Sequence, residues 1–281
     1  MKSILVPTDF SDQATYALDL AYGIAQKNNA TLKLLNVVEA PHGSSFNAMG
    51  EATPPDNNDE MFFALLIKRM EEKMQTVSQD PQYAGVEIEG YVEIGSPYES
   101  ISRTIVDHNV DLVVMGTQGT NGLEELLVGS NTEKVVRRAQ CPVLTVKQPI
   151  KADAIKNIAL ATNLEDNHKR LILQLTKLQE LFGATIHIVR VNSPGNFEND
   201  RYYKNEMKKF AEEHQLKDYT LNVYNESDEE DGIMYFAEDI NADMIALGTH
   251  GRSGIRRLLS GSIAEDLVNH SKRPVWTFRL Q

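Results

Sequence analysis

The chain has 281 residues and a formal net charge of −12; 41% of its residues are hydrophobic and one is cysteine. This length favours about two domains, each with its own core, and a single cysteine excludes an intramolecular disulfide framework. The acidic charge argues against binding to nucleic acid or to an anionic membrane surface, and no apolar stretch approaches the length of a transmembrane helix.

The first half of the chain alternates apolar runs with segments of helical spacing. Residues 3–6 form a short apolar run, and Ser11 can cap the helix that follows. Residues 41–60 are rich in Gly, Ser, Asn and Pro and form the longest predicted loop. Further strands are expected at residues 31–38, 86–94, 111–115 and 142–146, and helices at residues 14–28, 61–76, 98–108 and 131–139. This alternation indicates a parallel sheet.

The second half repeats this order after a linker at residues 148–154. Strands are expected at residues 158–161, 185–191, 243–247 and 274–278. The offset between the halves is 154 residues for the first two strands (158 − 4 and 185 − 31) and 132 residues beyond them (248 − 116). We therefore predict two copies of one domain, at residues 1–148 and 153–281.

A glycine-rich turn follows an apolar strand in each half, with the same spacing. The first copy has Gly116, Gly119 and Gly129-Ser130, and the second has Gly248, Gly251 and Gly261-Ser262. Glycine lets a ligand approach the backbone closely, and the free N–H groups of a helix's first turn favour an anion. Each turn is therefore a candidate phosphate site, and tight turns with tight helix packing are the alternative.

The residues after each glycine turn fit the start of a helix. Ser130 with Glu133, and Ser262 with Glu265, match the capping box S-x-x-E. We therefore expect Gly129 and Gly261 to lie just before helices. Neither copy has the lysine of a Walker A loop, and the first strand lacks the G-x-G-x-x-G of dinucleotide-binding folds.

Other chemistry finds little support in the sequence. The seven histidines lack metal-ligand spacing, so no metal site of the transition type is expected. Cys141 is expected to be buried packing and not a nucleophile. No catalytic residue is predicted, because a triad cannot be identified from spacing.

These residues resemble the universal stress protein family. The resemblance rests on G-x-x-G-x9-G-[ST] after an apolar strand, together with ILVPTDFS at the start and CPVLTVK at the end of the first half. It covers nearly the whole chain as two tandem domains. The family's fold implies that each half is an open α/β domain, a five-stranded parallel sheet flanked by helices, Rossmann-like and similar to adenine-nucleotide alpha-hydrolases.

The resemblance implies that the first domain binds an adenine nucleotide: ATP, or else ADP or AMP, with or without Mg²⁺. It places Asp9 beside the adenine and Val37 against the ring, with phosphate and ribose contacts from the glycine turn. The complete predicted site in this domain comprises Pro7, Thr8, Asp9, Val37, Met115, Gly116, Gly119, Gly129, Ser130, Asn131 and Thr132.

The second domain departs from this pattern. Its predicted, weaker site comprises Ala161, Thr162, Asn163, Val191, Gly248, Gly251, Gly261 and Ser262. Asn163 stands in the place of Asp9 and lacks its charge, and Ile263-Ala264 replaces two polar residues at the helix start. Five acidic residues at positions 226–231 weaken phosphate binding if they face the crevice. A weaker nucleotide site and a structural relic both stay open.

We expect a cytoplasmic stress-response regulator or adaptor whose nucleotide changes a surface that an unidentified protein partner reads. The alternatives are a slow Mg-dependent ATPase or nucleotidyl-transfer enzyme, in which Asp9 holds Mg²⁺, and a nucleotide-free dimerisation scaffold. No residue is placed as a strong general base, so at most weak hydrolysis is expected. On the family resemblance, the last strands of the two halves meet edge to edge as a pseudo-dimer within the chain. A homodimer of chains is compatible with the sequence.

Overall fold

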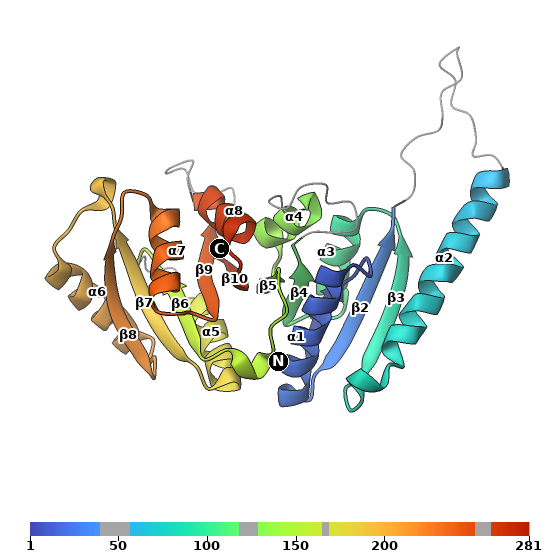
Figure 1. The fold of residues 1–281 in the computed structure, drawn as a ribbon, viewed down its shortest axis with the longest axis horizontal. Helices are drawn as coiled ribbons and strands as arrows, with labels where there is room; N and C mark the ends of the chain where they lie inside the picture. The colour runs from blue at the N-terminus through green and yellow to red at the C-terminus, as the bar shows by residue number, and fades with distance from the viewer. Residues whose placement is uncertain (40–56, 118–128, 165–168, 251–259, 281) are drawn as a thin grey trace, which may run out of the picture.

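The computed structural model describes residues 1–39, 57–117, 129–164, 169–250 and 260–280. The strands are β1 (Ser3–Pro7), β2 (Thr31–Val38), β3 (Ile88–Ile94), β4 (Leu112–Gly116), β5 (Val143–Val146), β6 (Asn157–Ala161), β7 (Thr185–Asn192), β8 (Tyr219–Asn225), β9 (Met244–His250) and β10 (Val275–Leu280). They form one 10-stranded sheet in the order β3-β2-β1-β4-β5-β10-β9-β6-β7-β8 (Figure 1).

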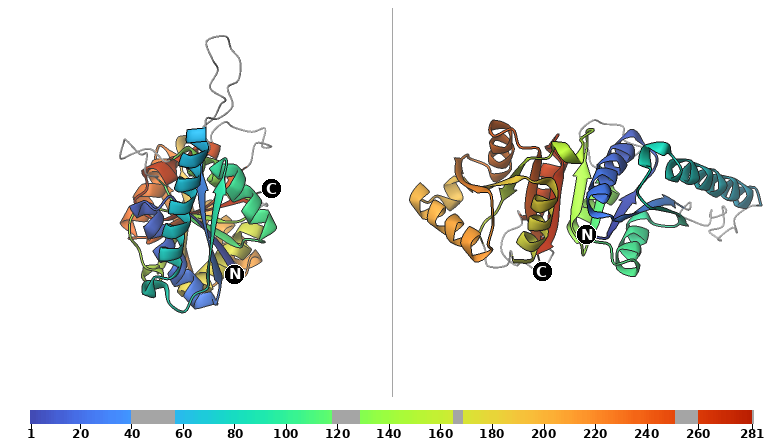
Figure 2. Two further views of the ribbon diagram at one scale, coloured as in Figure 1. Left: turned by 90° about the vertical axis from the view of Figure 1, so that its right-hand side faces the viewer. Right: turned by 90° about the horizontal axis from the view of Figure 1, so that it is seen from below.

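Helices cover both faces of this sheet (Figure 2). They are α1 (Asp12–Asn28), α2 (Asn57–Ser78), α3 (Pro97–Asp107), α4 (Ser130–Arg138), α5 (Lys169–Phe182), α6 (Asp200–Glu213), α7 (Glu229–Asp239) and α8 (Ser260–His270). Short 3-10 turns lie at η1 (Pro81–Tyr83), η2 (Ala152–Ala154) and η4 (Pro194–Asn196). Side chains of α1, α2, α5 and α6 pack into one hydrophobic cluster, and those of α3, α4, α7 and α8 into another.

Each half contributes five parallel strands, and the halves join through one antiparallel pair. Within a half, the first strand pairs with the second and the fourth, as β1 does with β2 and β4. At the junction, Leu144 of β5 lies opposite Trp276 of β10. The predicted α/β fold and the edge-to-edge meeting of the last strands are therefore confirmed.

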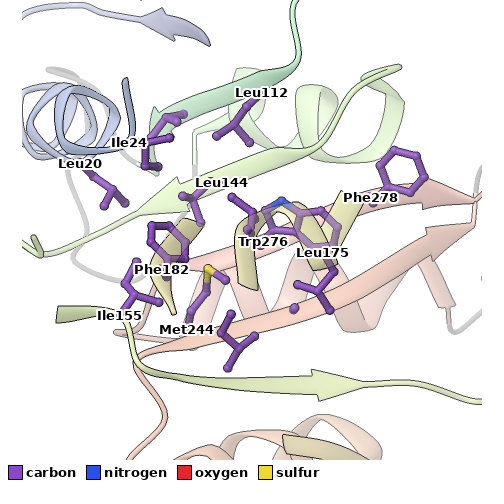
Figure 3. Close-up of a cluster of buried hydrophobic side chains, with 14 of the residues drawn as sticks. Leu20, Ile24, Leu112, Leu144, Ile155, Leu175, Phe182, Met244, Trp276 and Phe278 are labelled. Atoms are coloured by element: carbon purple, nitrogen blue, oxygen red, sulfur yellow. The ribbon is translucent and has the colours of Figure 1, made fainter. Parts of the chain in front are cut away.

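The junction has its own apolar core. Trp276 is fully buried, and Leu144 of β5 and the α5 side chains Leu175 and Phe182 belong to the same hydrophobic cluster (Figure 3). Burying an aromatic side chain of this size contributes on the order of 2–3 kcal/mol of hydrophobic stabilisation. Since this core draws on both halves, the two domains stabilise one another.

Two segments differ from the sequence prediction. Residues 57–60, expected in the long loop, begin α2. Residues 41–56 of that loop lie outside the described residues. The linker contains η2, which packs on α1: a Cβ added to Gly23 would lie 2.9 Å from the Cβ of Ala152.

Candidate functional site

The predicted residues of the first domain lie at the carboxyl ends of its strands, where ligands bind in open parallel sheets. Pro7 ends β1, and Gly116 ends β4. Val37, near the end of β2, and Met115 both belong to the hydrophobic cluster on the α3 and α4 face. The structure therefore brings the strand-borne residues to one edge of the sheet.

A tight turn connects β1 to α1 and orients Asp9. The Thr8 hydroxyl accepts a hydrogen bond from the Phe10 N–H at 3.0 Å, and an Asp9 carboxylate oxygen accepts one from the Ser11 N–H at 3.0 Å. Phe10 has φ of 62°, a left-handed conformation that costs energy in a bulky residue. Ser11 caps α1, as predicted, because its hydroxyl accepts from the Ala14 N–H at 3.2 Å.

The start of α4 is tied to the end of β4. Gly129, the N-cap residue, donates its N–H to the Thr117 carbonyl at 2.8 Å. The Thr132 hydroxyl donates to the Gly116 carbonyl at 3.2 Å. No side chain caps this helix in the described structure, and free N–H groups in the first turn of a helix are able to bind an anion.

The capping box predicted for each helix is wrong. In the first copy Gly129 takes the cap position, and Ser130 is an exposed residue of the first turn. In the second copy α8 begins at Ser260, so Gly261 and Ser262 lie inside the helix and not before it. Gly119 and Gly251 lie outside the described residues.

Gly116 and Gly129, the described glycines of the first turn, differ in how closely other atoms approach them. A Cβ on Gly116 would lie 2.9 Å from the Gln13 backbone, so Gly116 permits the close approach of α1. Gly129 has ordinary helix-cap dihedrals, φ −63° and ψ 140°. Among described residues, the nearest atom to a Cβ on Gly129 would be the Thr117 carbonyl oxygen at 3.7 Å. Backbone strain does not require glycine there, and neither does packing against the described part of the chain.

The predicted residues Ala161, Thr162, Asn163, Val191 and Gly248 of the second domain line one cavity of about 120 Å³. Its remaining walls are Val189, Arg190, Glu229, Ile233, Leu247 and Ile263. Glu229 belongs to the acidic run that was expected to face the crevice, whereas sequence reasoning missed Arg190. A charged residue inside the otherwise apolar run TIHIVRV was the available signal for Arg190.

The turn after β6 repeats the turn after β1, although its residues differ. The Thr162 hydroxyl accepts from the Leu164 N–H at 3.1 Å, and Leu164 has φ of 62°. Gly248 again serves packing, because a Cβ there would lie 2.7 Å from Leu280 and 2.9 Å from Leu171.

Most of the acidic run in the second domain is occupied elsewhere. Asp228 caps α7, accepting from the Glu230 N–H at 2.8 Å, and Glu230 pairs with His270 at 2.6 Å. Of the run, only Glu229 is among the described residues that line the cavity. The expected repulsion of phosphate therefore depends on one carboxylate.

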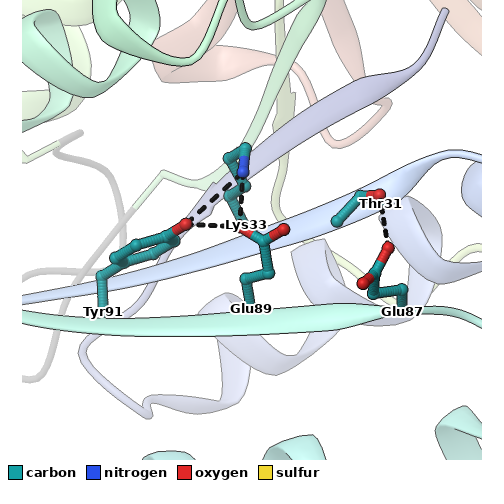
Figure 4. A network of polar contacts seen from close by, with 5 residues as sticks. All are labelled: Thr31, Lys33, Glu87, Glu89 and Tyr91. Atoms are coloured by element: carbon teal, nitrogen blue, oxygen red, sulfur yellow. Dashed lines mark hydrogen bonds and ion pairs between the residues drawn. The ribbon is translucent and has the colours of Figure 1, made fainter.

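Away from the site, each domain carries a polar network on the same face of its sheet. In the first, the Lys33 ammonium is buried and donates to Glu89 at 2.5 Å and to the Tyr91 hydroxyl at 3.4 Å (Figure 4). Burial lowers the pKa of Lys33, but the bonds to Glu89 and Tyr91 outweigh it and the pKa is raised. In the second, His187 contacts Thr220 at 2.9 Å and Asn157 at 3.1 Å.

Other candidate chemistry is weak in the described residues. Cys141 is buried, and burial raises the pKa of its thiol to about 12, so it is not a thiolate near neutral pH. No group of three or more metal-ligating side chains is found in the described ranges. Among their helices, none is both long enough and apolar enough to cross a membrane.

Comparisons with known proteins agree with this geometry. The sequence profile of the universal stress protein family matches residues 1–147 and 154–279. A universal stress protein of Methanocaldococcus jannaschii is 35% identical over 150 residues, covering 53% of this chain and 84% of that protein.

Among solved structures, a universal stress protein of Archaeoglobus fulgidus aligns with 99% of this chain and 98% of its own, with a TM-score of 0.76 and 20% identity. A universal stress protein solved in complex with cAMP aligns with 52% of this chain and 96% of its own, with a TM-score of 0.35 and 22% identity. The first of these shows a shared fold across both domains.

Proposed function

Because this chain belongs to the universal stress protein family, we propose that its first domain binds an adenine nucleotide and that a protein partner reads the bound state. Nucleotide binding occurs in the family, since one member has been solved in complex with cAMP. The nucleotide proposed here is ATP, with ADP or AMP as weaker occupants of the same place. The cellular role proposed is that of a stress-response regulator or adaptor in the cytoplasm.

Gly129 is the observation that supports this proposal most directly. Its dihedrals suit any residue, and no described neighbour would meet a Cβ more closely than 3.7 Å. Within the described residues nothing requires glycine at this position, whereas a ligand that approaches the backbone would favour it. The uncapped first turn of α4 begins at the next residue, where the helix dipole favours a phosphate.

The other predicted residues take complementary roles in the proposed complex. The exposed Ser130 hydroxyl and the half-buried Asn131 lie in the first turn of α4 and would contact phosphate or ribose. Asp9, oriented by its own turn, would accept a hydrogen bond from the adenine amine. Val37 and Met115 would pack against the ring through their apolar faces. If Mg²⁺ accompanies the phosphates, Asp9 is the carboxylate of this set that can approach it.

The test is isothermal titration of the full chain with Mg-ATP, together with mass spectrometry of the small molecules that the purified protein carries. We expect one strong site in the wild type and at least a 100-fold loss of affinity in Gly129→Val, because the side chain fills the place of the phosphate. Ala84→Val is the matched control, because Ala84 is exposed, has similar backbone dihedrals (φ −58°, ψ 142°) and lies in the same domain on the segment that leads into β3, away from the carboxyl ends of the strands. Equal binding in wild type and Gly129→Val would overturn the proposal.

A further inference from the structure

A second cavity, of about 440 Å³, opens beside the first at the carboxyl end of β7. It lies between the turn η4 and helix α6, on the opposite side of β7 from α7. Its lining includes Asn163, Arg190, Asn196, Tyr203 and Glu206. Asn163 and Arg190 line both cavities, so the two adjoin. The glycine turn of this domain contributes no described residue to the second cavity.

Arg190 is the group that gives this cavity its chemistry. Its guanidinium carbon lies 5.4 Å from the centre of the Tyr203 ring, a cation–π contact that holds the planar group flat. Its Nε is buried and has no hydrogen-bond partner within the described part of the chain. A guanidinium placed in this way presents fixed donors that match the oxygens of a carboxylate or a phosphate.

The first domain has an asparagine in place of Arg190. Asn36 lies at the equivalent place in β2 and is buried, donating its amide N–H to the Thr8 carbonyl at 2.8 Å. That amide bonds to the chain itself. Replacing it by the longer Arg190 provides a cation at the wall of an open cavity, which indicates a ligand site specific to the second domain.

The cavity is built before any ligand arrives. The Tyr203 hydroxyl donates to the Asn196 carbonyl, and the Asn196 amide donates to Glu229 at 2.8 Å. The Glu198 N–H donates to the Asn192 side chain at 3.1 Å. These bonds fix η4 against β7, α6 and α7, so binding would require little reorganisation of the walls.

The charges of the lining limit what can bind. Besides Arg190, the wall carries Glu198 and Glu206, and two carboxylates disfavour a polyanion. Exposed aromatic rings, Phe197 and Tyr202, stand at the rim and offer contact to a ring-bearing ligand. We propose that this cavity binds a small organic acid, a carboxylate or a phosphate monoester on a compact ring, with its anionic group on Arg190. This site is independent of the nucleotide site in the first domain.

The test uses the full-length Gly129→Val protein, so that the first domain does not compete for a nucleotide. Isothermal titration with AMP probes a phosphate monoester, and titration with phenylacetate probes a carboxylate. We expect saturable binding of at least one probe at one equivalent, and roughly tenfold or greater weakening in Arg190→Asn, which copies the first domain. Arg190→Lys keeps the charge without the planar fork and should fall between. Arg201→Asn, an exposed cation on α6, is the matched control.

The two probes distinguish between the two classes of ligand. Binding of AMP alone identifies a phosphate ligand and binding of phenylacetate alone a carboxylate, and either supports the second cavity if Glu206→Gln, which alters that cavity and not the first, also changes the affinity. Glu206→Gln should tighten AMP binding more than phenylacetate binding, since AMP carries more negative charge. Failure of both probes to bind, or binding that Arg190→Asn and Arg190→Lys leave unchanged, would overturn the proposal. Neither failure bears on nucleotide binding in the first domain, which is read from wild type against Gly129→Val.

Discussion

The two domains share a backbone and differ in the groups they present at the carboxyl ends of their strands. Both place a left-handed residue after the first strand, Phe10 in one and Leu164 in the other, each with φ of 62°. Both hold that turn with a threonine hydroxyl. The neighbouring side chains differ: Asp9 is replaced by Asn163, and Asn36 by Arg190. The turn is thus common to both domains, and the side chains on the turn and on the neighbouring strand are what differ.

The sheet faces differ in a parallel way. The first domain stabilises one face with an ion pair, Lys33 with Glu89, whereas the second uses His187, Thr220 and Asn157 at corresponding positions. One network is charged near neutral pH, and the other contains a histidine, His187, whose pKa burial lowers from its ordinary value of 6.5. The two domains should therefore respond differently to acid, although their folds match.

The largest effect should come from the junction that joins the domains. Trp276→Ala removes the ring that fills the shared core, and we expect a loss of about 3–5 kcal/mol in the free energy of unfolding. Leu144→Ala, at the paired position of the other domain, should cost about 2–4 kcal/mol. Urea unfolding followed by circular dichroism measures both. A cost below about 1 kcal/mol for Trp276→Ala would show that the domains do not depend on this contact.

The next effect concerns the charged network of the first domain. Lys33→Met leaves Glu89 and Tyr91 without their cation, and we expect a loss of about 1–2 kcal/mol at pH 7. The hydrogen bond from Lys33, followed by that from Tyr91, lowers the pKa of Glu89. The stabilisation is therefore complete above the ordinary carboxyl pKa of 4.5 and disappears as the pH falls through the lowered value.

The pH dependence of this stabilisation can be measured. The difference in unfolding free energy between wild type and Lys33→Met should shrink between pH 5 and pH 3, roughly the window in which carboxylates titrate. Lys27→Met removes an ion pair whose Asp153 side chain is 84% exposed, and it should change stability by less than about 0.5 kcal/mol. A constant difference for Lys33→Met down to pH 3 would contradict the assignment.

A reciprocal exchange tests the turn residues at a smaller scale. Asp9→Asn gives the first domain the residue of the second, and the loss of one charged hydrogen bond should weaken Mg-ATP binding by about tenfold. Asn163→Asp makes the opposite exchange and should leave that affinity unchanged, because it lies in the other domain. Calorimetric titration of both variants gives the comparison. Equal affinities in Asp9→Asn and wild type would remove Asp9 from the site.

The smallest effect is an acid sensitivity of the second domain. Burial lowers the pKa of His187 and of His214, so the unfolded chain takes up protons first as the pH falls. Stability from these groups is complete above the ordinary histidine pKa of 6.5 and declines below it. His187→Gln should therefore flatten the fall in Tm between about pH 6.5 and 5, and adding His214→Gln should flatten it further. Lys33→Met should leave this slope unaltered. If His187→Gln leaves it unaltered too, the cause lies elsewhere.

Most of the fold could be predicted from local patterns in the sequence. The apolar run of residues 31–38 is β2 to the residue, and Ser11 caps α1 as expected. The repeat offset also placed the partner strands of the two halves correctly. These features depend on neighbours in the sequence, through hydrogen bonding at caps and apolar spacing in strands.

The features that were missed depend on contacts between distant residues. Whether a glycine serves packing or a ligand cannot be known until its neighbours are in place. A Cβ would clash with α1 at Gly116, but it would clash with no described residue at Gly129. The start of α8 at Ser260 overrode a capping pattern that fits the sequence. Arg190 can be identified as a candidate ligand-binding residue only from the structure, in which α6 places the Tyr203 ring against its guanidinium.

The covalent join between the halves also has a bearing on how such a protein can change over generations. In a dimer of identical chains, every mutation appears in both copies, so neither binding site can drift without the other. Here a single chain encodes both copies, and β5 of the first pairs with β10 of the second. The second copy can therefore carry Asn163 and Arg190 while the first carries Asp9 and Asn36.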